Sequence, residues 1–134
     1  MRYLDSSAII KLIYREDHSE ELHQLLASSR VPLLTSSIGF VEIGRFLQRR
    51  QADAATLETA TRILGKFTRV ELTDAVMDQA VALPVRHLPT LGAIHLASAQ
   101  QLGDALTSFV AYDKRLVEAA RAERLPVETP GTTI

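Results

Sequence analysis

Three acidic residues that are far apart in the chain lie where predicted strands give way to predicted helices. Asp5 and Asp113 each follow a short apolar segment, and Glu42 lies inside a helix that begins a few residues before it. In a parallel α/β sheet such points share one edge, where side chains from distant segments meet. Carboxylate oxygens are the ligands that Mg²⁺ and Mn²⁺ prefer. The pattern predicts a cation site of Asp5, Glu42 and Asp113 that activates water for attack on a phosphodiester.

Each of these acids also has a simpler interpretation when it is taken alone. Asp5 and Asp113 are good N-cap residues for the helices that follow them. Glu42 could be an exposed helical acid that pairs with Arg45 or Arg49 along one face. Only the combination of the three acids favours a metal site over ordinary capping and pairing.

Strands and helices alternate along the chain. The patterns predict short strands over 2–4, 32–35, 70–72, 108–111 and 126–128. They predict helices that end at Tyr14, cover 19–28, run from Ser36 or Ser37 to Arg50, and cover 54–67, 74–83, 90–102 and 114–123. Such alternation is typical of an α/β fold with a parallel sheet.

The composition predicts one globular domain over residues 1–134. The chain is 46% hydrophobic and 23% charged, and it contains no cysteine, which excludes disulfides and thiolate metal sites. The sequence Met1-Arg2-Tyr3-Leu4-Asp5 reaches the charge of Asp5 too soon for a signal peptide, and no apolar run approaches the ~20 residues of a membrane span. We therefore expect a cytoplasmic protein without a membrane partner. The net charge of −1 leaves nucleic-acid contacts to local clusters such as Arg45, Arg49 and Arg50.

Four segments of the chain resemble, in order, the motifs of PIN-domain ribonucleases, above all the VapC-like toxins of bacterial toxin–antitoxin pairs. They are LDSSAIIKL at 4–12, TSSIGFVEIGR at 35–45, LGAIHLASA at 91–99 and FVAYDKRL at 109–116. Each motif alone is modest, but the four are collinear over nearly the whole chain. The resemblance implies a three-layer α/β/α fold around a mostly parallel sheet of about five short strands.

The resemblance also implies a metal-dependent endoribonuclease that cleaves structured RNA, such as tRNA or rRNA. On this basis Asp5, Glu42 and Asp113 bind Mg²⁺ or Mn²⁺, Ser7 orients the acids, and Arg45 faces the crevice and steadies a phosphate. The family further implies a homodimer and a co-expressed antitoxin whose C-terminal segment lies across the active-site groove.

Position 92 departs from the family pattern, which has Asp where this chain has Gly92. The glycine either permits a close backbone approach or a kinked helix start, or it marks a lost carboxylate of natural or engineered origin. Asp104 and Asp74 lie too far from this point to replace the missing acid. We therefore expect a site of three carboxylates with weakened metal binding and lowered or abolished cleavage.

Two other classes of protein stay open. A PIN-fold binding module that still engages antitoxin or RNA without turnover is favoured by Gly92. A receiver-like phosphotransfer domain is disfavoured, because Asp5 is followed by Ser6 and Ser7 rather than by a second acid.

Two further features have both a structural and a functional interpretation. His95 lies on an apolar helix, where we expect a core or interface histidine rather than a metal ligand. The apolar helical segments 9–14 and 22–26 either pack in the core or form a groove for an amphipathic antitoxin helix.

Overall fold

A sheet of five parallel strands forms the centre of the computed structural model, which describes all of residues 1–134. The strands are β1 (Arg2–Leu4), β2 (Leu33–Ser36), β3 (Phe67–Val70), β4 (Ser108–Val110) and β5 (Val127–Glu128). Their order in the sheet is β3-β2-β1-β4-β5, and every neighbouring pair is parallel. The direction of strand order reverses between β1 and β4, which is where ligands bind in open α/β sheets.

The central strands bury both of their faces. Tyr3 of β1 is in register with Phe109 of β4, and their rings stack at 5.4 Å between centroids. The next residues, Leu4 and Val110, belong to the core on the opposite face. Because successive side chains of a strand point to opposite faces, this alternation produces one core on each side of the sheet.

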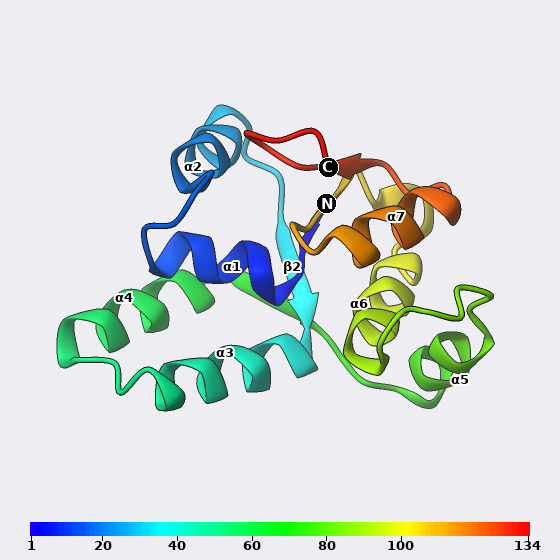
Figure 1. Ribbon diagram of the computed structural model, residues 1–134, viewed down its shortest axis with the longest axis horizontal. Helices are drawn as coiled ribbons and strands as arrows, with labels where there is room; N and C mark the ends of the chain where they lie inside the picture. Colours follow the sequence, from blue (N-terminus) through cyan, green and yellow to red (C-terminus); the bar gives the residue numbers. More distant parts are fainter.

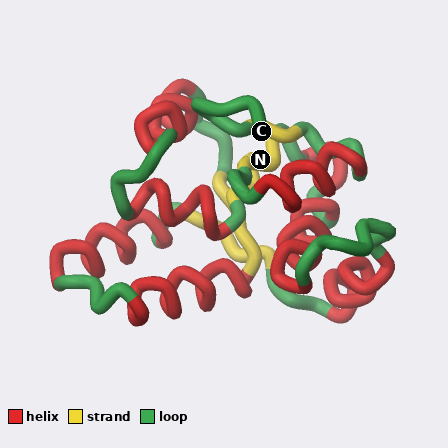
Figure 2. Tube along the Cα trace, in the orientation of Figure 1, coloured by secondary structure: helices red, strands yellow, loops and turns green.

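Seven α-helices cover the sheet. They are α1 (Ser6–Ile13), α2 (Ser19–Ser28), α3 (Ser37–Arg49), α4 (Ala54–Leu64), α5 (Asp74–Ala82), α6 (Thr90–Gln100) and α7 (Lys114–Ala122). Helices α1 to α4 lie on one side of β2, and α5 to α7 lie on the other (Figure 1). Figure 2 shows the strands enclosed between these two groups of helices. The predicted three-layer α/β/α fold is therefore confirmed. None of the helices has the length and apolar character needed to cross a membrane.

Several helices begin at a capping side chain. Asp5, Ser36 and Asp113, which the sequence predicts at helix starts, each accept a hydrogen bond from a backbone N–H in the first turn of the following helix. Thr73 caps α5 in the same way. At α6, Pro89 precedes the first residue Thr90, and no side chain caps this helix.

The boundary between α4 and β3 differs from the prediction of a helix over 54–67 and a strand over 70–72. Helix α4 ends at Leu64, and the strand already begins at Phe67. Phe67 pairs with Leu33 of β2 and is buried in the core. Its apolar character continues the helical pattern of α4, so only pairing with a distant strand identifies it as a strand residue. Strand β3 lies at the edge of the sheet.

Candidate active site

A pocket of about 200 Å³ at the carboxyl edge of the sheet brings together the three predicted acids. Its lining residues are Asp5, Ser6, Ser7, Glu42, Leu88, Pro89, Leu91, Gly92, His95, Asp113 and Leu116. Asp5 follows β1 and Asp113 follows β4, so the pocket lies at the point where the strand order reverses. Arg45 is exposed on α3, one turn beyond Glu42, and is not among the lining residues.

Asp5 is a buried carboxylate with two hydrogen bonds on a single oxygen. Its Oδ1 accepts from the Ala8 backbone N–H at 3.0 Å and from the Ser7 hydroxyl at 2.7 Å. Oδ2 makes no hydrogen bond within the protein. Burial raises the pKa of Asp5, although His95 and the bonds from Ser7 and Ala8 act in the opposite direction. The fold therefore compensates the charge of this carboxylate only in part, and a bound cation would compensate the rest.

Ser7 connects the two strand ends that carry the aspartates. Its hydroxyl donates to Asp5 and accepts from the backbone N–H of Tyr112 at 3.2 Å. Tyr112 directly precedes Asp113, whose Oδ1 accepts from the Leu116 N–H at 3.0 Å as the cap of α7. Asp113 therefore also keeps Oδ2 free of protein hydrogen bonds. Capping and metal binding are compatible for both aspartates, because each function needs a different oxygen.

Glu42 is hydrogen-bonded to His95, for which the apolar helix predicts a core or interface position rather than metal binding. The Glu42 Oε1 and His95 Nε2 atoms lie 2.6 Å apart, and the other ring nitrogen, Nδ1, lies 2.6 Å from Tyr3 Oη. Tyr3 and His95 are buried, whereas the Glu42 side chain is 22% exposed. Burial is also the main reason why the pKa of Tyr3 is raised. The expectation of a satisfied core histidine is correct, but its partner is a pocket acid.

Gly92 lines the same pocket as the three acids. A Cβ at this position would lie 2.9 Å from Leu88 Cδ1, 3.3 Å from Leu88 Cγ and 3.8 Å from Leu116 Cδ1. These are side-chain atoms, so no close backbone approach demands a glycine here. The Leu88 side chain occupies the space next to the absent carboxylate, and a larger residue at 92 requires Leu88 to shift.

The donor set fits a hard divalent cation in its chemistry but does not form a closed cage. Carboxylate oxygens from Asp5, Glu42 and Asp113 face one small pocket, and no thiolate competes with them. No three acidic or histidine side chains, however, converge closely enough to hold an ion by themselves. Mg²⁺ suits such a pocket, because it commonly keeps several waters and binds through one or two carboxylates.

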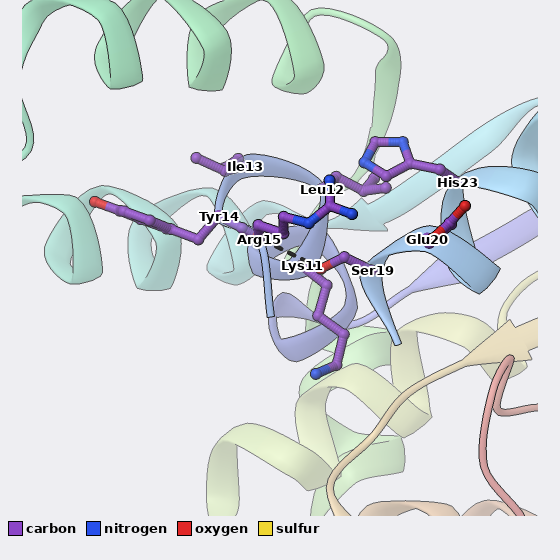
Figure 3. Close-up of a pocket in the computed structure, with 8 residues that line it drawn as sticks. All are labelled: Lys11, Leu12, Ile13, Tyr14, Arg15, Ser19, Glu20 and His23. Atoms are coloured by element: carbon purple, nitrogen blue, oxygen red, sulfur yellow. Dashed lines mark hydrogen bonds between the residues drawn. The ribbon is translucent and has the colours of Figure 1, made fainter. Parts of the chain in front are cut away.

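A second cavity, of about 360 Å³, lies between the end of α1 and the start of α2 (Figure 3). Lys11, Arg15, Glu20 and His23 give it a mixed charge, and Leu12 and Tyr14 contribute apolar surface. A neighbouring cavity of about 260 Å³ shares Leu12 and His23 and continues along Leu26, Leu33, Ile63 and Phe67. Ile9 and Leu22, by contrast, are core residues. Segments 9–14 and 22–26 thus contribute residues to the core and also line these two cavities.

The fold and the pocket define an α/β protein with an acidic site at the carboxyl edge of a parallel sheet. The PIN domain model matches residues 2–122, and this chain belongs to the PIN domain family. Ribonuclease VapC35 of Mycobacterium tuberculosis is 37% identical over 134 residues, which cover 98% of both chains. The resemblance to VapC-like PIN ribonucleases that the four motifs predict is therefore confirmed.

Solved structures have the same fold at lower sequence identity. The crystal structure of Mycobacterium tuberculosis VapC20, a sarcin–ricin loop cleaving toxin, has a TM-score of 0.71 and 21% identity over 89% of this chain and 95% of that one. A toxin–antitoxin complex from Klebsiella pneumoniae has a TM-score of 0.66 and 19% identity, and the match covers 84% of this chain and 87% of that one.

Proposed function

We propose that this chain is a metal-dependent endoribonuclease toxin of a toxin–antitoxin pair, with activity reduced by Gly92. The observation that carries the proposal is the pocket itself, which gathers Asp5, Glu42 and Asp113 from three separate segments around position 92. The nuclease names of its relatives support the reaction class. Structured RNA, either tRNA or ribosomal RNA, is the proposed substrate, since VapC20 is a sarcin–ricin loop cleaving toxin.

The residues of the pocket have distinct roles in this proposal. Asp5 and Asp113 would hold Mg²⁺ or Mn²⁺ through the oxygens that their caps leave free, and Glu42 would complete the set. When bound, the cation would supply the positive charge that favours attack of water on a phosphodiester. Ser7 fixes the orientation of Asp5. Arg45, exposed one turn further along α3, would contact an RNA phosphate outside the pocket.

We assign the groove between α1, α2 and α4 to the co-expressed antitoxin. An amphipathic segment fits a surface that combines Leu26 and Leu33 with the charged ends of Lys11 and Arg15. Its C-terminal continuation would reach the acidic pocket. Leu26→Glu should abolish co-purification of the antitoxin, whereas Leu57→Glu, an exposed position on α4, should not. A homodimer is expected as well, and light scattering of the purified chain tests it.

A binding module without turnover is the second candidate, and Gly92 favours it. This module would retain the fold and the antitoxin groove while it lacks the fourth acid of the family motif. The two candidates predict different outcomes when the acid is restored, because only a disabled nuclease gains activity from one carboxylate.

Cleavage of a pool of tRNA and ribosomal RNA by antitoxin-free protein tests both candidates. The chain as written is compared with Gly92→Asp and with Gly92→Asn, which has the same shape without the charge. Each is assayed with Mg²⁺, Mn²⁺ and EDTA. Metal-dependent cleavage by Gly92→Asp but not Gly92→Asn means a nuclease disabled at one carboxylate. Cleavage by the chain as written means that three acids suffice, and silence from all forms favours the binding module.

A further inference from the structure

A chain of hydrogen bonds runs from the backbone at the end of β2 to the pocket. The Ser36 backbone N–H donates to Tyr3 Oη at 3.1 Å. Tyr3 Oη and His95 Nδ1 lie 2.6 Å apart, and the phenol can donate its proton to this nitrogen. With Nδ1 accepting, the proton of the imidazole lies on Nε2, which donates to Glu42 Oε1 at 2.6 Å. With the proton on Nε2, all three hydrogen bonds have a donor and an acceptor.

The Glu42 side chain depends on this series of hydrogen bonds for its fixed position. Its bond to His95 is the single hydrogen bond that its side chain makes, and no lysine or arginine pairs with it. A long glutamate side chain loses conformational entropy when it is held in one rotamer, so an unpartnered Glu42 would sample several. His95 is rigid by comparison, because its ring is buried and both of its nitrogens are bonded.

Gly39 of α3 faces Thr35 and the His95 imidazole without a side chain. At Gly39, one turn before Glu42, an added Cβ would lie 3.4 Å from His95 Cε1 and 2.8 Å from Thr35 Oγ1. A side chain there would therefore require Thr35 to shift, and it would stand in van der Waals contact with the His95 ring. The glycine, the histidine and the tyrosine come from three separate segments, and together they place one N–H opposite Glu42.

We propose that His95, held by Tyr3, is a positioning residue that fixes the Glu42 carboxylate in the pocket for cation binding. The proposal rests on the metal-dependent function above and deepens it. The chain has three acids where the family motif has four, so the orientation of each remaining acid has more influence on affinity. His95 lies three residues after Gly92, and both residues line the pocket.

The proton pattern is the first test, and it needs no metal. Long-range ¹H–¹⁵N spectra of protein labelled with ¹⁵N in its histidine rings, recorded in EDTA at fixed neutral pH, report the tautomer of each of the four histidines. His95→Gln assigns the resonance. We expect the proton on Nε2 alone, and we expect Glu42→Gln to shift the Nε2 signal. A proton on Nδ1, or on both nitrogens, would overturn the proposal.

Mn²⁺ affinity, measured by the loss of the free-ion electron paramagnetic resonance signal, is the second test. His95→Gln keeps an N–H near the position of Nε2, whereas the shorter side chain in His95→Asn does not reach Glu42. We expect His95→Asn to weaken Mn²⁺ binding by about 10-fold, as loss of a partner behind a metal ligand typically does. Recovery of most of this loss in His95→Gln is the expected signature of positioning.

A double-mutant cycle separates positioning from general destabilisation. In the Glu42→Gln background, His95→Asn should cause no further loss of Mn²⁺ affinity, because its effect passes through Glu42. A purely structural role would lower the melting temperature of His95→Gln and His95→Asn alike, and their effects on affinity would stay additive with Glu42→Gln. That result would overturn the proposal.

Failure of the two proposals can be told apart. If the parent chain binds no Mn²⁺ while its tautomer and Nε2 shift are as expected, the metal-dependent function is wrong and the positioning of Glu42 stands. If the parent binds Mn²⁺ but His95→Asn binds it equally well, the cation site stands and the positioning proposal is wrong.

Discussion

Helices α1 and α4 both begin with an aspartate that caps the first turn, yet the two carboxylates have opposite environments. Asp53 Oδ1 accepts from the Thr56 N–H at 2.8 Å at the surface, and this bond is the main reason why the pKa of Asp53 is lowered. Asp5 makes the equivalent bond to Ala8 at 3.0 Å, but burial raises its pKa. The same capping geometry favours the ionised form of the aspartate at the start of α4, whereas burial disfavours it at the start of α1.

The difference indicates which cap has a second role. A cap that only stabilises a helix belongs at the surface, where the ionised form is solvated. A buried carboxylate opposes the stability of the fold unless a cation or a proton compensates it. The start of α6 is the third case, because it faces the same pocket with neither a capping side chain nor an acid at Gly92.

The largest difference between the two caps is expected in metal affinity. Asp5→Asn keeps an oxygen to cap α1 but removes the charge, and it should weaken Mn²⁺ binding by about 100-fold or more, since even outer partners of metal ligands contribute roughly 10–100-fold. Asp53→Asn should leave Mn²⁺ affinity unchanged. Titration of both variants beside the parent chain tests this contrast, and equal affinities in all three would refute a cation at Asp5.

Thermal stability in EDTA should respond to the two substitutions with opposite sign. The raised pKa of Asp5 means that its contribution to stability is present below its ordinary value of 3.8 and is lost as pH rises through the raised pKa. Asp5→Asn should therefore raise the melting temperature at pH 7, and the gain should disappear as the pH falls toward 3.8.

The lowered pKa of Asp53 gives the reverse dependence. Its contribution is present above 3.8 and is lost as pH falls through the lowered pKa. Asp53→Asn should therefore lower the melting temperature slightly at pH 7 and have no effect in acid. Melting curves from pH 3 to pH 8 in roughly half-unit steps measure both changes. The same sign for both substitutions at pH 7 would show that burial does not govern Asp5.

A charge placed at the start of α6 extends the comparison to the third helix. Gly92→Asp and Gly92→Asn both require Leu88 to move, so their difference isolates the charge. In EDTA we expect Gly92→Asp to be less stable than Gly92→Asn by about 1–2 kcal/mol, because it adds a fourth acid to an uncompensated pocket. Mg²⁺ should raise the melting temperature of Gly92→Asp more than that of the parent. An equal response to Mg²⁺ in both would contradict this explanation.

Local chemistry made much of this fold predictable. Asp5, Ser36 and Asp113 are capping residues next to apolar segments, and neighbouring residues are sufficient to locate the strand ends and the pocket edge. The start of β3 was not predictable in this way, because Phe67 becomes a strand residue through pairing with Leu33.

The role of His95 was not predictable for the same physical reason. Its partners Tyr3 and Glu42 lie 92 and 53 residues away along the chain. An apolar helix around a histidine predicts burial, but it does not reveal which polar groups satisfy the ring. A usable signal was its spacing of three residues from Gly92, which places both positions on the same face of α6.

The Asp5 cap also differs from the Asp53 cap because a neighbouring side chain, Ser7, donates a hydrogen bond to it. Substitution of Ser7 is expected to change the free energy of unfolding only slightly. Its hydroxyl holds Asp5 and accepts from the Tyr112 N–H, so it ties the ends of β1 and β4 together. Ser7→Ala should lower the free energy of unfolding by about 1 kcal/mol, because it removes one hydrogen bond to the carboxylate and leaves the Tyr112 N–H without its partner. Ser6→Ala is the matched control, since Ser6 also lines the pocket but makes no side-chain hydrogen bond. Chemical denaturation in EDTA measures the free energy of unfolding of both variants. Because Ser7 stabilises the charged form of Asp5, the effect of Ser7→Ala should be smaller in the Asp5→Asn background. Equal losses in both backgrounds would mean that Ser7 stabilises the Tyr112 segment and not the carboxylate.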